Sequence, residues 1–128
     1  VLPLHPRTRA RIYQFELHHL LEPLTITMPL GFFMMVLLER LASLVVTDSG
    51  GVQKEAFLQG TPCLTVRTET EWVELLECGW NKLADPTNPK AILEAMMQQI
   101  NFSSFHQRPL LYGDGYAAEE ILKCLKKL

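Results

Sequence analysis

The sequence predicts an α/β domain in which a parallel sheet is flanked by helices. Short apolar segments alternate with helix-like segments along the 128 residues, a pattern that favours parallel strands joined by right-handed crossovers. Hydrophobic residues make up 48% of the chain and charged residues 20%, as in an ordinary globular domain. The chain has no internal repeat and no low-complexity linker. We therefore expect residues 1–128 to form a single domain.

The first part of the chain is expected to hold two strands and two helices. Val1–Leu4 resembles the end of a strand, so we expect a piece of a longer protein that lacks the first strand and helix of its domain. Arg7–Leu20 is predicted to be one helix with a broad apolar face, and Leu24–Ile26 a short strand. Phe32–Leu41 is a predicted helix that is apolar almost all round, and we expect it to be well buried.

The middle of the chain continues the alternation. Leu44–Thr47 is a predicted strand, and Val52–Gln59 a helix. Gly60 suits the end of that helix, because glycine readily adopts the left-handed conformation of a C-terminal cap. Pro62–Val66 is the next predicted strand, and Thr70–Leu76 a short helix.

The last third of the chain is expected to add an edge strand and two helices. Asn81–Ala84 is the predicted edge strand. Pro89–Ile100 is a predicted helix, because Asn88 can cap it and proline fits its first turn. An irregular connection, Asn101–Leu111, leads to an amphipathic helix, Ala117–Leu128, with lysines in its last turns.

Composition argues against several classes of protein. The net charge of −2 is unlike that of a nucleic-acid-binding domain, and no apolar run reaches the roughly 18 residues of a membrane span. Cys63, Cys78 and Cys124 are odd in number and lack metal-site spacing, which argues against a disulfide framework or a zinc site. His18 and His19 are adjacent on a predicted helix and would point in different directions, which does not suit a metal pair. The simplest location is the reducing cytoplasm.

The most informative motif follows the strand Leu44–Thr47. Ser49, Gly50 and Gly51 stand between that strand and the next helix, and Glu55 lies one to two turns into the helix. Unpaired amides and the positive dipole end make such a helix start suitable for a phosphate, while the carboxylate can accept hydrogen bonds from ribose. The plainer interpretation is a tight turn with a serine cap and a solvated carboxylate. Asp48 is expected to fix the turn.

Four segments follow predicted strands and are expected to meet at one rim of the sheet, where α/β proteins bind ligands. These segments are His5–Arg7, Pro29–Gly31, Ser49–Gly51 and Arg67–Glu69. Plainer interpretations are a loop histidine for His5 and an exposed arginine for Arg67. Glu71 is a candidate for positioning Arg67.

The sequence resembles the non-hydrolysing UDP-N-acetylglucosamine 2-epimerase family. The matching stretches are Pro3–Thr8, Pro29–Phe32, Leu44–Glu55, Gly60–Leu64, Arg67–Glu74, Cys78–Asn81 and Tyr112–Ala118. The resemblance implies a Rossmann-like C-terminal half of a glycosyltransferase-B type architecture. It also implies interconversion of UDP-N-acetylglucosamine and UDP-N-acetylmannosamine, by elimination and re-addition of UDP without a redox cofactor. Residues 112–128 would then be a closing helix that packs on the missing N-terminal domain.

The resemblance also implies which residues bind UDP. Ser49, Gly50 and Gly51 would hold the diphosphate, with Arg67 near it, and Glu55 would bind the ribose. The segment Leu30–Met35, including Phe32 and Met35, would flank the uracil, and His5 would lie on the ligand-facing rim. The catalytic histidine and carboxylates are expected upstream of this chain, which we therefore expect to be inactive alone.

The sequence departs from the family pattern at three positions, and two alternative functions remain to be considered. The family usually has a carboxylate at the position of Lys54, and often has an Asp at the position of Met34 and an aromatic residue at that of Met35. We expect Lys54 to alter a surface contact or a contact behind the site, and Met35 to make a softer platform for the base. A glycosyltransferase that uses a UDP-sugar is one alternative. The other is a module that only binds UDP or pairs with another protein, including itself as a homodimer.

Overall fold

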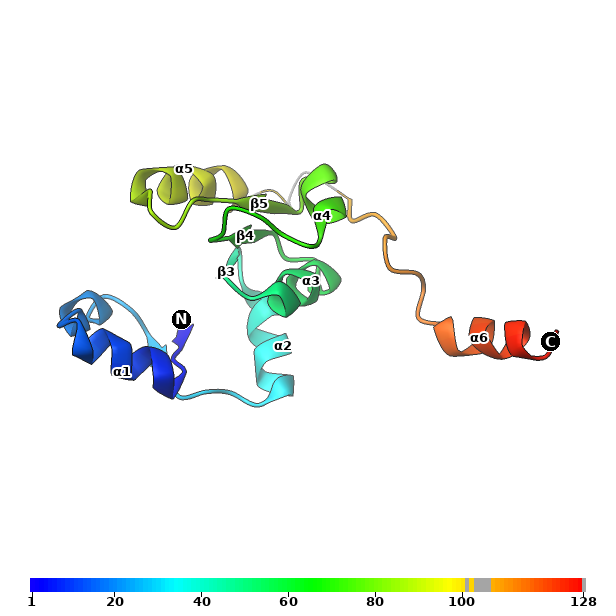
Figure 1. The fold of residues 1–128 in the computed structure, drawn as a ribbon, viewed down its shortest axis with the longest axis horizontal. Helices are drawn as coiled ribbons and strands as arrows, with labels where there is room; N and C mark the ends of the chain where they lie inside the picture. The colour runs from blue at the N-terminus through cyan, green and yellow to red at the C-terminus, as the bar shows by residue number, and fades with distance from the viewer. Residues whose placement is uncertain (101, 103–106, 128) are drawn as a thin grey trace. The chain divides into compact units, whose positions relative to one another are not determined.

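A computed structural model describes residues 1–100, 102 and 107–127 (Figure 1). The chain divides into two compact units, Val1–Leu38 and Glu39–Leu128. Among the described residues, each unit contains one parallel sheet, with two strands in the first unit and three in the second. The predicted parallel α/β class is confirmed, with its strands in two sheets.

The first unit begins with a strand, as predicted. β1 (Leu2–Pro3) pairs in parallel with β2 (Ile26–Thr27). Between them lie α1 (Pro6–Gln14) and the short 3₁₀ helix η1 (His18–Leu21). The crossover from β1 to β2 is therefore helical, which is the usual connection between parallel strands.

The predicted helix Arg7–Leu20 is wrong in its second half. The chain leaves the helix at Glu16, whose φ of 56° is left-handed. The amide of Leu17 donates to the carbonyl of Ile12 at 2.9 Å, and the amide of Glu16 donates to the carbonyl of Tyr13 at 3.1 Å. This is the hydrogen-bond pattern of a Schellman cap. Such a cap usually carries glycine, and its absence here left no stop signal in the sequence.

The helix α2 (Phe32–Leu41) has the predicted bounds, but the expectation that it is well buried is wrong. Phe33 is 85% exposed and Leu41 is 73% exposed, while the one buried residue of this fully described helix is Glu39. An apolar sequence favours burial, but burial also requires a partner surface that covers the helix.

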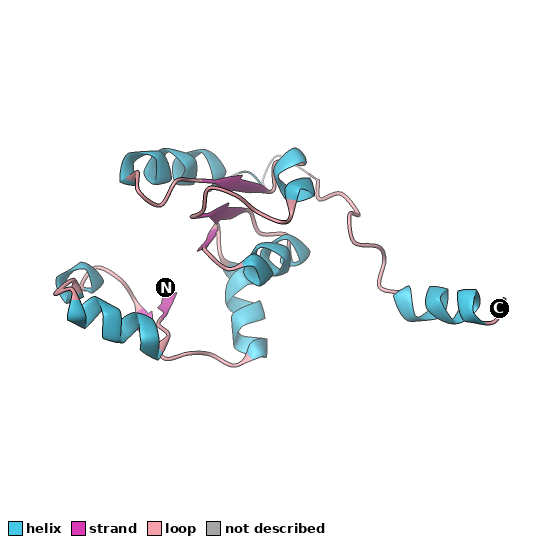
Figure 2. Ribbon diagram, in the orientation of Figure 1, coloured by secondary structure: helices cyan, strands magenta, loops and turns pink. Residues whose placement is uncertain are grey.

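The second unit is built on a three-stranded parallel sheet. β3 (Val45–Thr47) pairs with β4 (Cys63–Thr65), which pairs with β5 (Asn81–Leu83), so β4 is central and β5 is the predicted edge strand (Figure 2). All three residues of β4 are buried, and Leu64 at its centre is fully enclosed.

In the described part of the chain, these strands are followed by the helices α3 (Gly50–Gln59), α4 (Val73–Glu77), α5 (Pro89–Gln99) and α6 (Ala117–Leu125). Gly60 ends α3 in the left-handed conformation, with φ of 76°, as predicted. Asn88 caps α5 as predicted, because its Oδ1 accepts a hydrogen bond from the Ala91 amide at 3.1 Å. Part of the predicted irregular connection before α6, including His106, lies outside the described residues.

The core of the second unit joins α3, α4 and the residue that directly precedes β5. Phe57, Leu75 and Trp80 form its buried centre. The ring of Phe57 meets Trp80 and Tyr112 edge to face, with centroids 5.9 and 5.6 Å apart. Arg108 donates to the carbonyls of Phe57 and Leu58 near the C-terminal end of α3, where a cation suits the helix dipole. The segment before α6 is thereby attached to α3.

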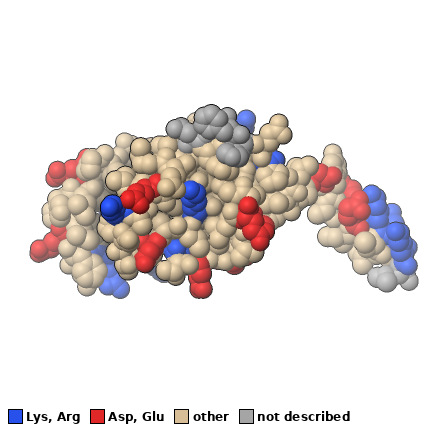
Figure 3. Space-filling view, turned by 90° about the horizontal axis from the view of Figure 1, so that it is seen from above, with Lys and Arg blue, Asp and Glu red and all other residues tan. Residues whose placement is uncertain are grey.

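Charged side chains of both signs are mixed on the face shown in Figure 3. In α6, Glu119 and Glu120 lie in the first turn and Lys123 in the last, as the helix dipole favours. Within the described parts of the chain, no helix is long and apolar enough to cross a membrane.

Candidate functional site

The junction between β3 and α3 is a tight turn closed by two hydroxyl groups. The Oγ1 of Thr47 accepts from the Ser49 amide at 3.0 Å, and the Oγ of Ser49 accepts from the Val52 amide at 3.5 Å. Thr47, rather than Asp48 as expected, therefore closes this turn. Ser49 is the N-cap, and the helix begins at Gly50, two residues earlier than predicted. Amides of this first turn lack partners within the helix and lie at its positive end.

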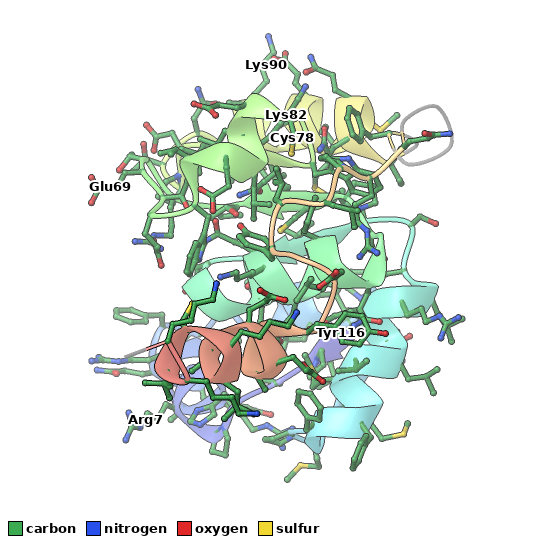
Figure 4. All side chains as sticks on the ribbon, turned by 90° about the vertical axis from the view of Figure 1, so that its right-hand side faces the viewer. Arg7, Glu69, Cys78, Lys82, Lys90 and Tyr116 are labelled. Atoms are coloured by element: carbon green, nitrogen blue, oxygen red, sulfur yellow. The ribbon has the colours of Figure 1, made fainter. Side chains whose placement is uncertain are left out.

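Arg67 is brought to the start of α3 by Glu71. Its Nη1 lies 3.2 Å from Oε2 of Glu71, which agrees with the predicted positioning role of that carboxylate. A Cβ atom on Gly50 would collide with the same carboxylate, so glycine leaves room for it. The indole of Trp72 donates to the Gly50 carbonyl at 2.8 Å and attaches this loop to the helix. Glu69, in contrast, is exposed and points outward (Figure 4).

A buried side chain, Gln53, holds this region together from beneath. Its Nε2 donates to the Ser49 carbonyl at 3.3 Å, and its Oε1 accepts from Thr70 Oγ1 at 2.6 Å and from Asn81 Nδ2 at 3.0 Å. Asn81 in turn accepts from the hydroxyl of Thr65 at 2.9 Å. Gln53, Thr65 and Asn81 are all buried. The start of α3, the Arg67 loop and strands β4 and β5 therefore share one hydrogen-bonded network.

We expect Gln53→Leu to lower the free energy of unfolding by about 3 kcal/mol, because it leaves buried polar partners unpaired. Denaturant unfolding of the two proteins measures the difference. The matched control is Gln98→Leu, an exposed glutamine in α5 whose loss should change stability by less than about 0.5 kcal/mol. Equal effects of the two substitutions would show that the network does not stabilise the fold.

Glu55, the predicted ribose ligand, lies half-buried in the second turn of α3 beside a second carboxyl group. Burial, followed by the negative charge of Glu55, raises the pKa of this neighbour, Glu39, to about 7. Burial also raises the pKa of the Cys63 thiol to about 12, so this cysteine is protonated at neutral pH and is a poor nucleophile.

Lys54 lies between two aromatic rings. Its Nζ is 4.0 Å from the ring centroid of Trp72 and 4.1 Å from that of Tyr112, a cation–π arrangement. The Tyr112 hydroxyl donates to Oε1 of Glu74 at 2.8 Å, and burial, followed by this bond, raises the pKa of the phenol. Lys54 thus links α3 to the segment before α6.

A shallow, open hollow of about 390 Å³ lies at the carboxyl ends of the sheet in the second unit. It is lined by Val46, Thr47, Asp48, Val66 and Pro86, which follow or end the three strands. This is the edge at which α/β proteins bind ligands, and the hollow borders the Ser49 turn. None of the eight predicted UDP-binding residues lines it.

The remaining predicted site residues belong to the first unit. His5 is exposed and caps α1, because its Nδ1 accepts from the Arg7 amide at 3.2 Å. Phe32 is 66% exposed at the start of α2, and Met35 is half-buried one turn later. The structure thus places Ser49, the two glycines and Glu55 on one helix and brings Arg67 to its start. His5, Phe32 and Met35 belong to the other unit, Val1–Leu38.

Two residues of the site region were missed by sequence reasoning. Glu39 was hidden in an apolar helix, although a carboxylate in such a segment is itself a signal of a special environment. Gln53 gave no signal, because its three partners come together only in the folded chain. Among the described residues, no group of three or more His, Cys, Asp or Glu could hold a metal ion. His18 stacks on Tyr13, with ring centroids 5.8 Å apart.

Comparison with known proteins places this α/β domain in a class and then in a family. Solved sugar-nucleotide epimerases share its fold. The UDP-N-acetylglucosamine 2-epimerase from Methanocaldococcus jannaschii superposes with a TM-score of 0.82 at 34% identity, over 98% of this chain and 35% of its own. The family model for UDP-N-acetylglucosamine 2-epimerase matches residues 1–126. The chain therefore belongs to the UDP-N-acetylglucosamine 2-epimerase family, and the predicted resemblance is confirmed.

Individual relatives match all or nearly all of this chain, but the match covers only part of their own length. The UDP-2,3-diacetamido-2,3-dideoxy-D-glucuronate 2-epimerase of Pseudomonas aeruginosa is 44% identical over all of this chain and 35% of its own length. A second M. jannaschii structure, in complex with UDP-GlcNAc and UDP, has a TM-score of 0.80 at 35% identity, over 97% of this chain and 34% of its own. The chain thus spans about a third of the length of these relatives, which fits the predicted C-terminal part of a glycosyltransferase-B type architecture.

Proposed function

We propose that this chain is the UDP-binding part of an enzyme that interconverts UDP-N-acetylglucosamine and UDP-N-acetylmannosamine. The supporting observation is the β3–α3 junction, where a serine cap and two glycines open a helix at the carboxyl edge of a parallel sheet. It occurs in a chain that the epimerase family matches over residues 1–126. This family membership favours an epimerase over a glycosyltransferase.

The proposed role of the junction is to bind the diphosphate and stabilise it as a leaving group. Negative charge grows on the diphosphate as the bond from the sugar C1 to oxygen breaks, and the first-turn amides and the dipole of α3 oppose that charge. Arg67 would exchange its partner Glu71 for phosphate. Both side chains are substantially exposed, so their ion pair is worth about 1 kcal/mol or less and is readily replaced.

The other proposed contacts follow the family resemblance. Glu55, half-buried on α3, would accept hydrogen bonds from the ribose hydroxyls. For the first unit, we propose that Phe32 and Met35 flank the uracil and that His5 belongs to the ligand-facing rim. Phe32 and His5 are exposed, as a ligand contact requires.

Proton chemistry is proposed to lie outside this chain. A base removes the C2 proton of the sugar while UDP leaves with the electron pair of the C1–oxygen bond, giving a glycal. Protonation of C2 from the opposite face and return of UDP to C1 then give the epimer. By the same resemblance, the groups that move the proton belong to the rest of the longer protein.

A second candidate differs in the sugar. The Pseudomonas aeruginosa relative, at 44% identity, is named for a 2,3-diacetamido-2,3-dideoxy-D-glucuronate rather than for N-acetylglucosamine. Both sugars carry an acetamido group at C2 and are attached to UDP. The candidate site is proposed to bind the UDP part, which both substrates share, so it suits either substrate equally.

The test of the proposed function uses the full-length protein that contains this chain. We expect its incubation with one of the two UDP-sugars to produce the C2 epimer, followed by proton NMR of the anomeric signals. The other UDP-sugar is the matched comparison and identifies the substrate. Failure to epimerise either sugar, or transfer of the sugar to an acceptor, would contradict the proposal.

The C-terminal segment 112–128 is proposed to pack on the N-terminal domain of the longer protein. Its helix α6 is strongly amphipathic, and Ile121, Leu122 and Leu125 on it are each more than half exposed in this chain. Relatives are about three times as long as this chain, and their additional residues could cover such a surface. The cytoplasmic location and the homodimer stay predictions.

A further inference from the structure

Glu39 is the least expected buried residue of the chain. It lies near the C-terminal end of the apolar helix α2 and is only 3% exposed. Both of its carboxylate oxygens are buried and, within the described residues, neither accepts a hydrogen bond. A buried carboxylate without a donor is strongly disfavoured, and such a group usually takes up a proton instead.

The surroundings of Glu39 supply an acceptor rather than a cation. From α3, the carboxyl of Glu55 interacts with it, and from β4 the protonated thiol of Cys63 lies within its electrostatic reach. The hydroxyl of Thr61, which follows α3, donates at 2.6 Å to the main-chain oxygen of Glu39 and not to its carboxylate. The group available to pair with the Glu39 carboxyl is therefore another carboxyl.

Two adjacent carboxyl groups in a shielded place share one proton more readily than they carry two charges. Ionised, the pair repels and the oxygens of Glu39 stay without a donor. When the pair holds one proton, Glu39 can donate a hydrogen bond to Glu55. This removes both the charge repulsion and the buried charge on Glu39 that has no donor. Glu39 is the more buried of the two carboxyl groups, so burial favours its neutral form and makes it the donor of the pair.

We propose that Glu39 is a positioning residue that carries a proton at neutral pH and donates it in a hydrogen bond to Glu55, and that loss of this proton weakens nucleotide binding. The consequence for binding rests on the proposed function, in which Glu55 holds the ribose. A carboxylate fixed through one oxygen presents the other to the ribose hydroxyls. When the pair loses its proton, repulsion displaces Glu55 from that orientation.

The shared proton is tested first without any nucleotide. Carboxyl carbons of the glutamates are followed by NMR from acidic to alkaline pH in the wild-type chain, in Glu39→Gln and in Glu55→Gln. We expect one carboxyl to titrate near neutrality in the wild type, to be absent from Glu39→Gln and to titrate at lower pH in Glu55→Gln. Titration of every glutamate below about pH 5, as in model peptides, would overturn the proposal.

The positioning role is tested by calorimetry with UDP on the full-length protein. We expect wild-type affinity to fall about tenfold between about pH 7 and pH 8.5, as linkage to one lost proton requires. Glu39→Gln keeps a neutral donor, so its affinity should stay close to the wild-type value at pH 7 and change little with pH. It also corrects for titration of UDP itself. Glu39→Leu removes the donor and should bind weakly at both pH values.

The outcomes separate this inference from the proposed function. A wild-type pH profile parallel to that of Glu39→Gln overturns the positioning role even if UDP binds tightly. Absence of UDP binding at every pH overturns the proposed function and the positioning role with it. The shared proton is then judged by the NMR titration alone.

Discussion

The 128-residue chain on its own is expected to leave the C2 proton of UDP-N-acetylglucosamine unexchanged in heavy water. Elimination of UDP begins with removal of that proton, and the proposed roles of the described residues are to bind and stabilise UDP. Relatives about three times as long contain the further chain in which the resemblance places the acid and base groups. Leaving-group stabilisation without a base removes only part of the barrier.

Proton NMR of the C2 signal over time measures this exchange. The full-length protein under the same conditions is the positive control, and circular dichroism of the 128-residue chain confirms that it is folded. Measurable exchange with the chain alone would show that a proton-transfer group lies within it. Buried Glu39, with its raised pKa, would then be the first residue to examine.

The second large effect is expected for Glu55→Ala. Loss of hydrogen bonds from ribose to a charged carboxylate should weaken UDP binding by roughly 1–3 kcal/mol, which is about a five- to 150-fold rise in the dissociation constant. Calorimetry on the full-length protein measures it. The matched control is Glu77→Ala, which removes an exposed carboxylate from the end of α4 and should leave affinity unchanged.

Stability distinguishes a lost contact from a damaged fold. Glu55→Ala removes the charge that opposes ionisation of Glu39, so the variant should be no less stable than the wild type above pH 7. The raised pKa of Glu39 means that its contribution to stability is largest below the unfolded value of 4.5 and is lost as pH rises through about 7. Unchanged UDP affinity in a stable Glu55→Ala variant would remove Glu55 from the site.

Local signals along the chain were sufficient for much of the fold. The cap residues Asn88 and Gly60 marked two helix ends that the structure confirms. The position of Ser49 indicated a helix start after β3, and the structure places the first helical residue directly after it. These features depend on residues within a few positions of one another, so the local sequence specifies them.

The sequence did not predict features that depend on residues distant in the chain or on an unusual backbone conformation. The left-handed Glu16 ends α1 without a glycine. The exposure of α2 could not be read from its apolar sequence, because burial depends on what packs against a helix and not on the helix alone. Lys54 gave no sign of its two aromatic neighbours, of which Tyr112 lies far along the chain.

The sequence by itself determined the α/β class, the family, and the serine–glycine turn that opens α3. The alternation of strands and helices, the helix caps and the order of the motifs each depend on residues that are close together in the sequence. Only the tertiary structure decided what surrounds that turn. It brought Glu71 to Gly50, joined Gln53 to partners in three segments, and set Glu39 beside Glu55. These residues are far apart in the chain, and their charges and hydrogen bonds act on one another only when folding closes the distance.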